Sequence, residues 1–402
     1  MTTLIHPNAR EKIEKILHGI LKNYKKQGVM PILRPTELKN LSTEIFKNQE
    51  IASIFDYSDL YWLILENLQL SVQYGEPTFL APPEESRITD EECKEFSKKV
   101  LSTIDSLPIT YEIHFDVPFI KFGKSQYISE DISYITGIGI ENRGNTNSIE
   151  FKNYLKIKSS GYATTDKNQS AIHDALSKMK IFMELGRLTG FLKKPMFAIP
   201  ERKRFGISLP DIDFATVKRT GCEDQTFKAR LGLSTSNYLG KITSYNSSAE
   251  NKTKSAGSQD LSKLVAIYKI IEEKTNLENC KGIRSALEWS FDAEADDDER
   301  IKFIKKCIAL EASLGEGNEN GSITERLSDR CAFTIGKTPT ERKEIRDSVR
   351  DIYKIRSKFV HGEVSKFDSE QKKLASSCAT FLDKVLNAEL DSLCQWIETK
   401  NK

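Results

Sequence analysis

The chain has 402 residues, more than a single domain usually contains, and this length predicts two or three domains. Its 60 basic and 58 acidic side chains give a formal net charge of +2, so any affinity for nucleic acid must come from a local basic patch. The first 20 residues mix charge into every turn, and no apolar run approaches the roughly 18 residues of a membrane span, so we expect a soluble, cytoplasmic protein without membrane contact.

Residues 8 to about 105 are predicted to be mainly helical. In the segment 8–27, apolar residues recur at helical spacing, and residues 58–72 (SDLYWLILENLQLSV) form a second such stretch. The residues on the first stripe are Ile13, Ile16, Leu17, Ile20 and Leu21.

The pattern changes after Pro108, and residues 108–235 are predicted to bear strands. Segment 109–122 (ITYEIHFDVPFIKF) alternates and is rich in β-branched and aromatic residues, and similar pieces follow at 132–138, 154–163 and 195–209. Within this region a helix is expected over 169–192, where one apolar stripe would pack on the sheet. Its residues are Ile172, Leu176, Met179 and Met183. Residues 1–240 are therefore expected to form an N-terminal α+β region.

Residues 241–259 contain mostly Ser, Asn, Lys and Gly, which predicts a flexible linker. Beyond it, residues 260–402 are predicted to form a bundle of five or six helices, giving an α+β chain with an all-α C-terminal part. The sequences SITE (Ser322–Glu325) and TPTE (Thr338–Glu341) predict capping boxes, and DSEQ (Asp368–Gln371) predicts the start of the last long helix.

The seven cysteines are scattered and include no C-x-x-C pair, which predicts reduced thiols, several of them in the core. They are Cys93, Cys222, Cys280, Cys307, Cys331, Cys378 and Cys394. We expect no disulfide framework, no metal and no organic cofactor.

Arg356 and His361 lie near the end of the helix that TPTE begins. Arg356 falls on the apolar stripe of that helix, where an unpaired guanidinium is costly to bury, so it must face an acidic partner, a subunit interface or an anionic ligand. Five residues turn an ideal helix by about 140°, so the two side chains share one space only if the helix ends before Gly362. The alternative is an ion-paired arginine and a histidine at a helix end.

The same helix is a candidate phosphate-binding patch. Between Glu341 and Val360 it carries seven basic residues against four acidic ones. We expect weak RNA contacts from Arg346, Arg350, Lys354 and Lys358.

Three stretches resemble, in order, the Apea-like branch of the HEPN superfamily. They are residues 283–315, 323–336 and 341–363, the last reading ERKEIRDSVRDIYKIRSKFVHGE. Arg356 and His361 match the superfamily's R-x4-6-H motif, with Ser357 where many members have Asn. Glu311 and Arg330 match polar positions of the same stretches, and we expect supporting roles for them or ordinary ion pairs.

The resemblance implies a HEPN helical bundle that acts as a metal-independent endoribonuclease, often a toxin or an anti-phage abortive-infection effector, with the motif assembled from two chains. Transfer RNA is the first expected substrate, and the partners expected are RNA and a second copy, in a homodimer or a higher oligomer. The N-terminal region would regulate cleavage. A non-catalytic HEPN module for dimerisation or RNA binding is the main alternative, and the toxin half of a two-protein pair is a third.

Overall fold

The computed structural model describes residues 5–25, 34–71, 89–118, 120, 125–143, 146–164, 169–193, 212–221, 226–244, 256–273, 278–315, 322–363 and 366–400. The chain divides into two compact units that interleave along the sequence. Unit 1 comprises Met1–Ile113, Lys158–Ala175 and Thr216–Arg230, and unit 2 comprises His114–Ile157, Leu176–Ala215 and Leu231–Lys402. Unit 2 therefore contains residues on both sides of the boundary expected at residue 240.

Among the described residues of 8 to 105, unit 1 contains five helices, which confirms the helical prediction for these residues. They are α1 (Pro7–Lys25), α2 (Pro35–Ile45), α3 (Gln49–Ile54), α4 (Tyr57–Ser71) and α5 (Asp90–Asp105). In α1 the expected stripe is buried at Ile13, Leu17, Ile20 and Leu21. Helix α5 starts with a reciprocal capping box between Thr89 and Glu92.

The strands form a six-stranded sheet with the order β2-β3-β4-β1-β6-β7. Their bounds are β1 (Ile109–Asp116), β2 (Gln126–Tyr127), β3 (Ile132–Arg143), β4 (Thr146–Gly161), β6 (Phe214–Arg219) and β7 (Thr226–Arg230). The alternation predicted for β1 is confirmed, since every second residue from Ile109 to Phe115 is buried. The strand expected at 195–209 lies outside the described residues.

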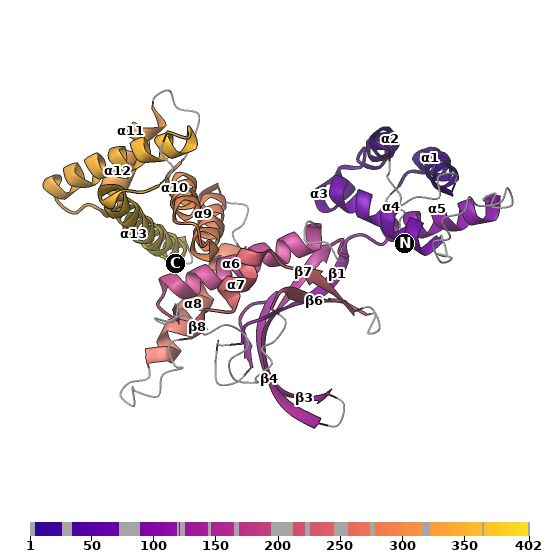
Figure 1. The fold of residues 1–402 in the computed structure, drawn as a ribbon, viewed down its shortest axis with the longest axis horizontal. Coiled ribbons are helices and arrows are strands. Elements are labelled where there is room, and N and C mark those ends of the chain that lie inside the picture. The colour runs from indigo at the N-terminus through magenta and orange to yellow at the C-terminus, as the bar shows by residue number, and fades with distance from the viewer. Residues whose placement is uncertain are drawn as a thin grey trace. The chain divides into compact units, whose positions relative to one another are not determined.

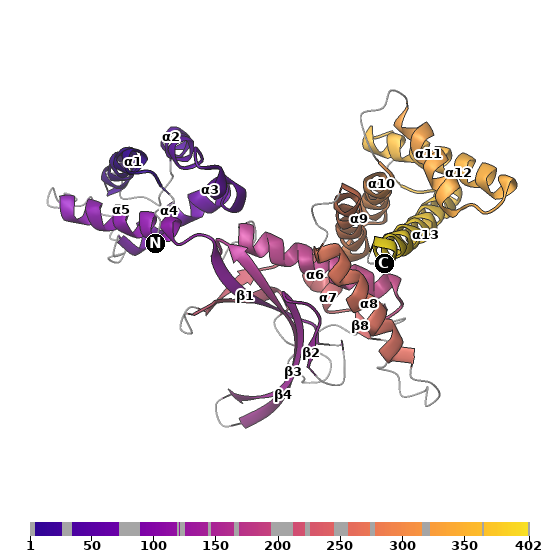
Figure 2. The same ribbon diagram turned by 180° about the vertical axis from the view of Figure 1, so that it is seen from behind.

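Strands β3 and β4 make a long antiparallel hairpin (Figures 1 and 2). Its register pairs Ile132 with Ile157 and runs without a bulge to Arg143 and Thr146.

Helix α6 (Ser170–Leu188) follows the hairpin, and from Leu176 onward it belongs to unit 2. Three of the four stripe residues, Ile172, Met179 and Met183, are fully buried, and Leu176 is partly buried. Its polar side chains bind α9 (Glu278–Ala295): Ser177 donates to Glu288 over 2.6 Å, and Lys180 forms an ion pair with Asp292 at 2.9 Å. Two short strands, β5 (Leu192–Lys193) and β8 (Thr243–Ser244), pair with each other in an antiparallel arrangement. Helix α7 (Leu233–Leu239) precedes β8 in the sequence.

The C-terminal part of unit 2 is helical, as predicted. The described residues form α8 (Ala256–Glu273), α9, α10 (Glu299–Leu314), α11 (Ile323–Ile335), α12 (Pro339–Val360) and α13 (Ser369–Lys400). Helix α9 packs along α10, α11 packs along α12, and α13 contacts all four. Of the segment expected as a linker, residues 245–255 lie outside the described residues.

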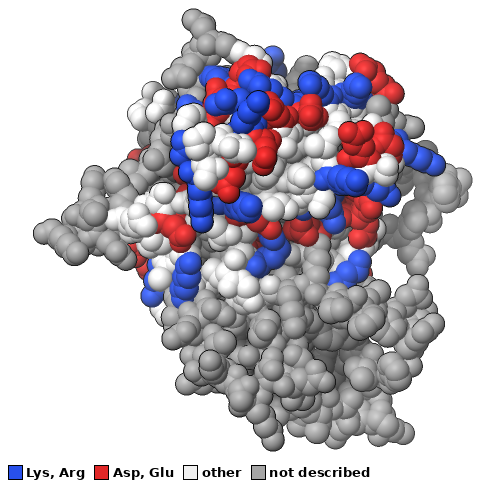
Figure 3. Space-filling model, turned by 90° about the vertical axis from the view of Figure 1, so that its left-hand side faces the viewer, with Lys and Arg blue, Asp and Glu red and all other residues white. Residues whose placement is uncertain are grey.

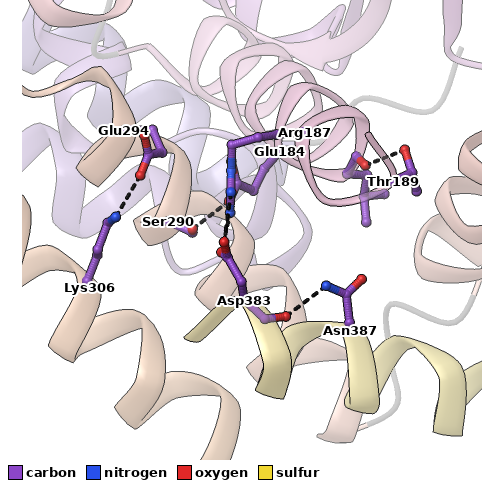
Figure 4. Close-up of polar contacts among 9 residues, drawn as sticks. Glu184, Arg187, Thr189, Ser290, Glu294, Lys306, Asp383 and Asn387 are labelled. Atoms are coloured by element: carbon purple, nitrogen blue, oxygen red, sulfur yellow. Dashed lines mark hydrogen bonds and ion pairs between the residues drawn. The ribbon is translucent and has the colours of Figure 1, made fainter. Parts of the chain in front are cut away.

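A buried ionic cluster joins α6, α9 and α13 (Figure 4). The guanidinium of Arg187 binds the fully buried Glu184 with contacts of 2.7 to 3.0 Å and Asp383 of α13 with contacts of 2.6 and 3.1 Å. The Ser290 hydroxyl donates to Glu184. Burial by itself lowers the pKa of Arg187, but the two carboxylates outweigh burial and raise it. The guanidinium of Arg187 therefore stays charged, and each of its three nitrogens donates to a carboxylate.

The cysteine prediction is confirmed for the described residues. Cys93, Cys280, Cys307, Cys331 and Cys378 are buried thiols outside any disulfide, and Cys394 is a partly exposed thiol outside any disulfide. Among the described helices, none has both the length and the apolar character that crossing a membrane requires.

Candidate active site

Helix α12 begins and is oriented as its sequence predicts. Thr338 accepts a hydrogen bond from the Glu341 N–H, Glu341 accepts one from the Thr338 N–H, and Pro339 occupies the first helical turn. Val349 and Ile352 are fully buried on the face that packs into the bundle.

The start of α11 differs from its prediction. Ser322 is the N-cap residue, but its side chain makes no cap hydrogen bond. The carboxylate of Glu325 binds Arg350 of α12 instead, with an N–O distance of 2.5 Å. A tertiary ion pair has therefore replaced the reciprocal box expected over Ser322–Glu325.

Helix α12 ends directly before His361, whose N–H still donates to the Ser357 carbonyl over 3.0 Å. The Gly362 N–H donates to the Phe359 carbonyl over 3.1 Å, and the Glu363 N–H donates to the Lys358 carbonyl over 2.9 Å. These two bonds, with Gly362 at a φ of +75°, form a Schellman motif, which needs a residue that tolerates the left-handed region. His361 is thus the C-cap residue.

The imidazole of His361 is exposed. Within the described part of the chain it makes no hydrogen bond and no ion pair. It lies about 7.5 Å along the helix axis from Arg356, on the last turns of α12. The structure brings the two residues to the same end of the helix without direct contact among the described atoms.

Arg356 lies at the α10–α12 contact and is only partly satisfied. One terminal nitrogen, Nη2, lies 3.4 Å from Oε1 of Glu311, and the two side chains are 32% and 24% exposed. Its Nε atom is shielded from solvent and has no hydrogen-bond partner among the described residues. Buried N–H groups are nearly always paired, so this donor marks a place where an external oxygen would be stabilised.

Two further side chains surround this ion pair, and sequence analysis missed both. The hydroxyl of Tyr353 donates to the main-chain carbonyl of Cys307 over 3.3 Å, and Tyr353 is 6% exposed. The Cys307 sulfur lies 3.9 Å from that of Cys378 on α13. Helical periodicity places Tyr353 three residues before Arg356 on the same face, which is the signal that could have found it.

Aromatic packing fixes the last turns of α12. The ring of Phe359 meets those of Phe303 and Phe367 at centroid distances of 6.4 and 4.6 Å, and Phe303 meets Phe367 at 5.6 Å. All three contacts are edge-on, an arrangement that aromatic pairs prefer. The helix end that carries His361 is therefore anchored on α10 and on the segment before α13.

The remaining expected supporting residues lie apart from this contact. Arg330 donates to the main-chain carbonyl of Leu314, the last residue of α10, over 2.5 Å, which satisfies a free helix-end carbonyl. Ser357 is exposed on α12. Of the two polar positions, only Glu311 contacts Arg356.

Three of the four expected RNA-binding cations already have acidic neighbours. Arg346 pairs with Asp329 at 2.5 Å, Arg350 pairs with Glu325 and also with Asp347 at 3.3 Å, and Lys354 pairs with Asp351 at 2.8 Å. Lys358 is exposed and makes no ion pair within the described residues. Both signs of charge are interspersed on the face drawn in Figure 3.

No group of three or more His, Cys, Asp or Glu side chains among the described residues has the geometry to hold a metal ion. Comparison with known proteins gives no match: no family model, curated protein or solved structure is similar to this chain. The interpretation of the site therefore depends on its own geometry and on the sequence motif.

Proposed function

We propose that this chain is an endoribonuclease of the HEPN type that cleaves RNA without a metal, through attack of the 2′-hydroxyl on the adjacent phosphate. The observation that carries the proposal is the state of Arg356. Its guanidinium is held by one carboxylate at 3.4 Å, and its buried Nε–H has no hydrogen-bond partner among the described residues. It lies at the same helix end as the imidazole of His361, which makes no hydrogen bond or ion pair within that part of the chain.

The two residue types suit this reaction. The guanidinium of Arg356 presents a planar fork of N–H donors that binds two phosphate oxygens, and it stabilises the charge that builds up on the phosphorane. An imidazole with an ordinary pKa of about 6.5 can accept or donate a proton near neutral pH. The 2′ oxygen forms the new bond to phosphorus, the 5′ oxygen leaves, and the products are a 2′,3′-cyclic phosphate and a free 5′-hydroxyl.

This chemistry needs a base for the 2′ proton and an acid for the leaving 5′ oxygen. A single imidazole cannot fill both positions at once, so a second copy of the chain would supply the second histidine across a two-fold interface. Large apolar side chains exposed on α11 and at the end of α12 support such an interface. They are Ile323 at 52%, Phe333 at 61% and Val360 at 53% exposure.

The biological setting follows from the resemblance. A cytoplasmic toxin or abortive-infection effector that cleaves transfer RNA would need control, and unit 1 is the candidate regulator. Because unit 2 includes residues 114–157 and 176–215, deletion of the first 240 residues would remove part of it. Control is better tested by substitutions in unit 1 in the full chain.

The test is incubation of the purified protein with total RNA and with transfer RNA in excess EDTA, followed by analysis of fragment ends. Wild type is expected to give discrete fragments with cyclic phosphate ends, and His361→Ala is expected to give none. His173→Ala is the matched control, since His173 is an exposed histidine on α6. Equal cleavage by wild type and His361→Ala would contradict the proposal.

A second candidate function is a non-catalytic HEPN module for dimerisation or RNA binding. The observation that favours it is the pairing of Arg346, Arg350 and Lys354 with acidic neighbours, which leaves few free cations on α12. Under this alternative, His361→Ala leaves both the oligomer and the RNA unchanged.

A further inference from the structure

Helices α10 and α12 are joined by two adjacent polar contacts, one from the Tyr353 hydroxyl to the main-chain carbonyl of Cys307 and one between the side chains of Arg356 and Glu311. On α12, Tyr353 and Arg356 are three residues apart, and on α10, Cys307 and Glu311 are four apart, so each pair lies on one face of its helix. Tyr353 bonds to Cys307, and Arg356 bonds to Glu311. The arginine contact is thus one of two adjacent links between the same two helices.

The first link acts on the helical turn that carries the second. The Tyr353 hydroxyl binds the carbonyl oxygen of Cys307, and in an α-helix this carbonyl also accepts the N–H of Glu311, four residues later. Tyr353 therefore fixes the Cys307 carbonyl, and this carbonyl is also the hydrogen-bond acceptor of the Glu311 N–H. The tyrosine is 6% exposed, so water does not compete for its hydroxyl.

The hydroxyl stays a donor over the whole physiological pH range. Burial raises the pKa of Tyr353 far above its ordinary value, and the neighbouring Cys307 and the negative charge of Glu311 raise it further. The phenol therefore keeps its proton beside the carboxylate, and its hydrogen bond to Cys307 persists.

We propose that Tyr353 is a positioning residue for the reaction proposed above: it fixes the turn of α10 that carries Glu311, and Glu311 in turn orients the guanidinium of Arg356 toward the scissile phosphate. This inference rests on the proposed function for the identity of the phosphate. Tyr353 touches neither substrate nor reacting atoms, and it acts through Glu311.

The test begins with Tyr353→Phe, which keeps the ring and removes the hydroxyl. Loss of one neutral hydrogen bond predicts a fall in kcat of about three- to tenfold with KM unchanged. The matched control is Tyr268→Phe, because Tyr268 is a buried tyrosine of α8 whose hydroxyl lies 3.5 Å from a carboxylate, that of Glu272. This control is expected to change neither constant.

A double-mutant cycle separates positioning from general packing. If Tyr353 acts through Glu311, Tyr353→Phe has no further effect on kcat in a Glu311→Gln background. If its effect is an unrelated structural one, the fold-reductions in kcat of the two single variants multiply in the double variant. Multiplying effects in the double variant overturn the inference.

A readout that needs no activity distinguishes the two proposals. In protein labelled with ¹⁵N-arginine, the Nε–H signal of Arg356, identified by its loss in Arg356→Lys, is expected to shift in Tyr353→Phe and not in Tyr268→Phe. An unchanged signal in Tyr353→Phe overturns the positioning inference. If the signal shifts while wild type leaves RNA intact, the positioning of Arg356 is supported and the proposed function fails.

Discussion

Two arginines of unit 2, Arg187 and Arg356, differ in how many of their guanidinium donors have hydrogen-bond partners. Arg187 binds two carboxylates from different helices through both edges of its guanidinium (Figure 4). In the part of the chain that the structure describes, Arg356 has one polar contact, at 3.4 Å, and a buried Nε–H without a hydrogen-bond partner. The R-x4-6-H spacing singles out Arg356 in the sequence, but the sequence does not show how far the donors of either arginine are occupied, because Asp383 and Glu311 come from other helices.

This difference in occupied donors distinguishes an arginine that stabilises the fold from one that can bind a ligand. A guanidinium such as that of Arg187, whose three nitrogens each bind a carboxylate, has little left to offer a ligand, and its removal mainly leaves its carboxylate partners without a cation. A guanidinium with unused donors at a helix end contributes little to the free energy of unfolding, and its unused donors can bind an external anion. The predictions below test this comparison in decreasing order of expected effect.

The largest loss of unfolding free energy is expected for substitution of Arg187. Arg187→Met leaves the fully buried Glu184 without its cation, and breaking a buried pair in this way costs about 3–5 kcal/mol of unfolding free energy. Arg356→Met, with partly exposed partners, should cost about 1 kcal/mol or less while abolishing RNA cleavage. Urea denaturation of both variants provides the measurement.

The control for this pair is Glu184→Gln combined with Arg187→Met. Because the double variant has no unpaired buried charge, it should recover part of the stability lost in Arg187→Met. Equal destabilisation by the two methionine variants would remove the distinction between the arginines.

A smaller effect is expected at a buried carboxylate that has hydrogen bonds but no cation. Asp59 in unit 1 accepts hydrogen bonds from the N–H groups of Asp56 and Ser170, at 3.1 and 2.9 Å, and burial raises its pKa to about 6, with a smaller contribution from the Asp56 charge. The folded protein then binds this proton more tightly than the unfolded chain, so the contribution grows as pH falls through 6.

Between pH 7 and pH 5, Asp59 should add about 1 kcal/mol of unfolding free energy. The measurement is the stability difference between wild type and Asp59→Asn at the two pH values, in which the other titrating groups cancel. A difference that is the same at pH 5 and pH 7 would refute the assignment.

The smallest effect concerns two lysines one turn apart on α12. Lys354 is paired with Asp351, whereas Lys358 makes no ion pair within the described residues. With a cleavage-deficient His361→Ala protein, Lys358→Ala should reduce the salt dependence of RNA binding, log K against log salt, by about 0.7 for one lost phosphate contact. Lys354→Ala should change it less, and equal changes would show that ion pairing does not decide which cation binds RNA.

Much of α12 could be predicted from sequence because its determinants are local. The Thr338 cap, Pro339, the apolar stripe and the stop at Gly362 all act within a few residues, and the structure confirms each of them. The cysteine thiols of the described residues, none of them in a disulfide and most of them buried, also agree with composition and spacing.

The partners of the charged residues could not be predicted, because they come from helices distant in sequence. Glu311 lies 45 residues from Arg356, and Glu325 leaves its expected capping role to bind Arg350. The same limit applies to the units: a polar linker is visible in the sequence, but the grouping of residues 114–157 with the C-terminal helices is a tertiary property.

Gly362, with its left-handed backbone, sets where α12 stops and therefore where His361 lies relative to Arg356. Moving the end of α12 by a single residue would rotate the following side chain by about 100° and shift it by about 1.5 Å. The distance between the arginine and the histidine is therefore set jointly by the count of residues between them and by where the helix stops. A protein engineer who wished to move the histidine relative to the arginine could leave both residues in place and relocate the glycine.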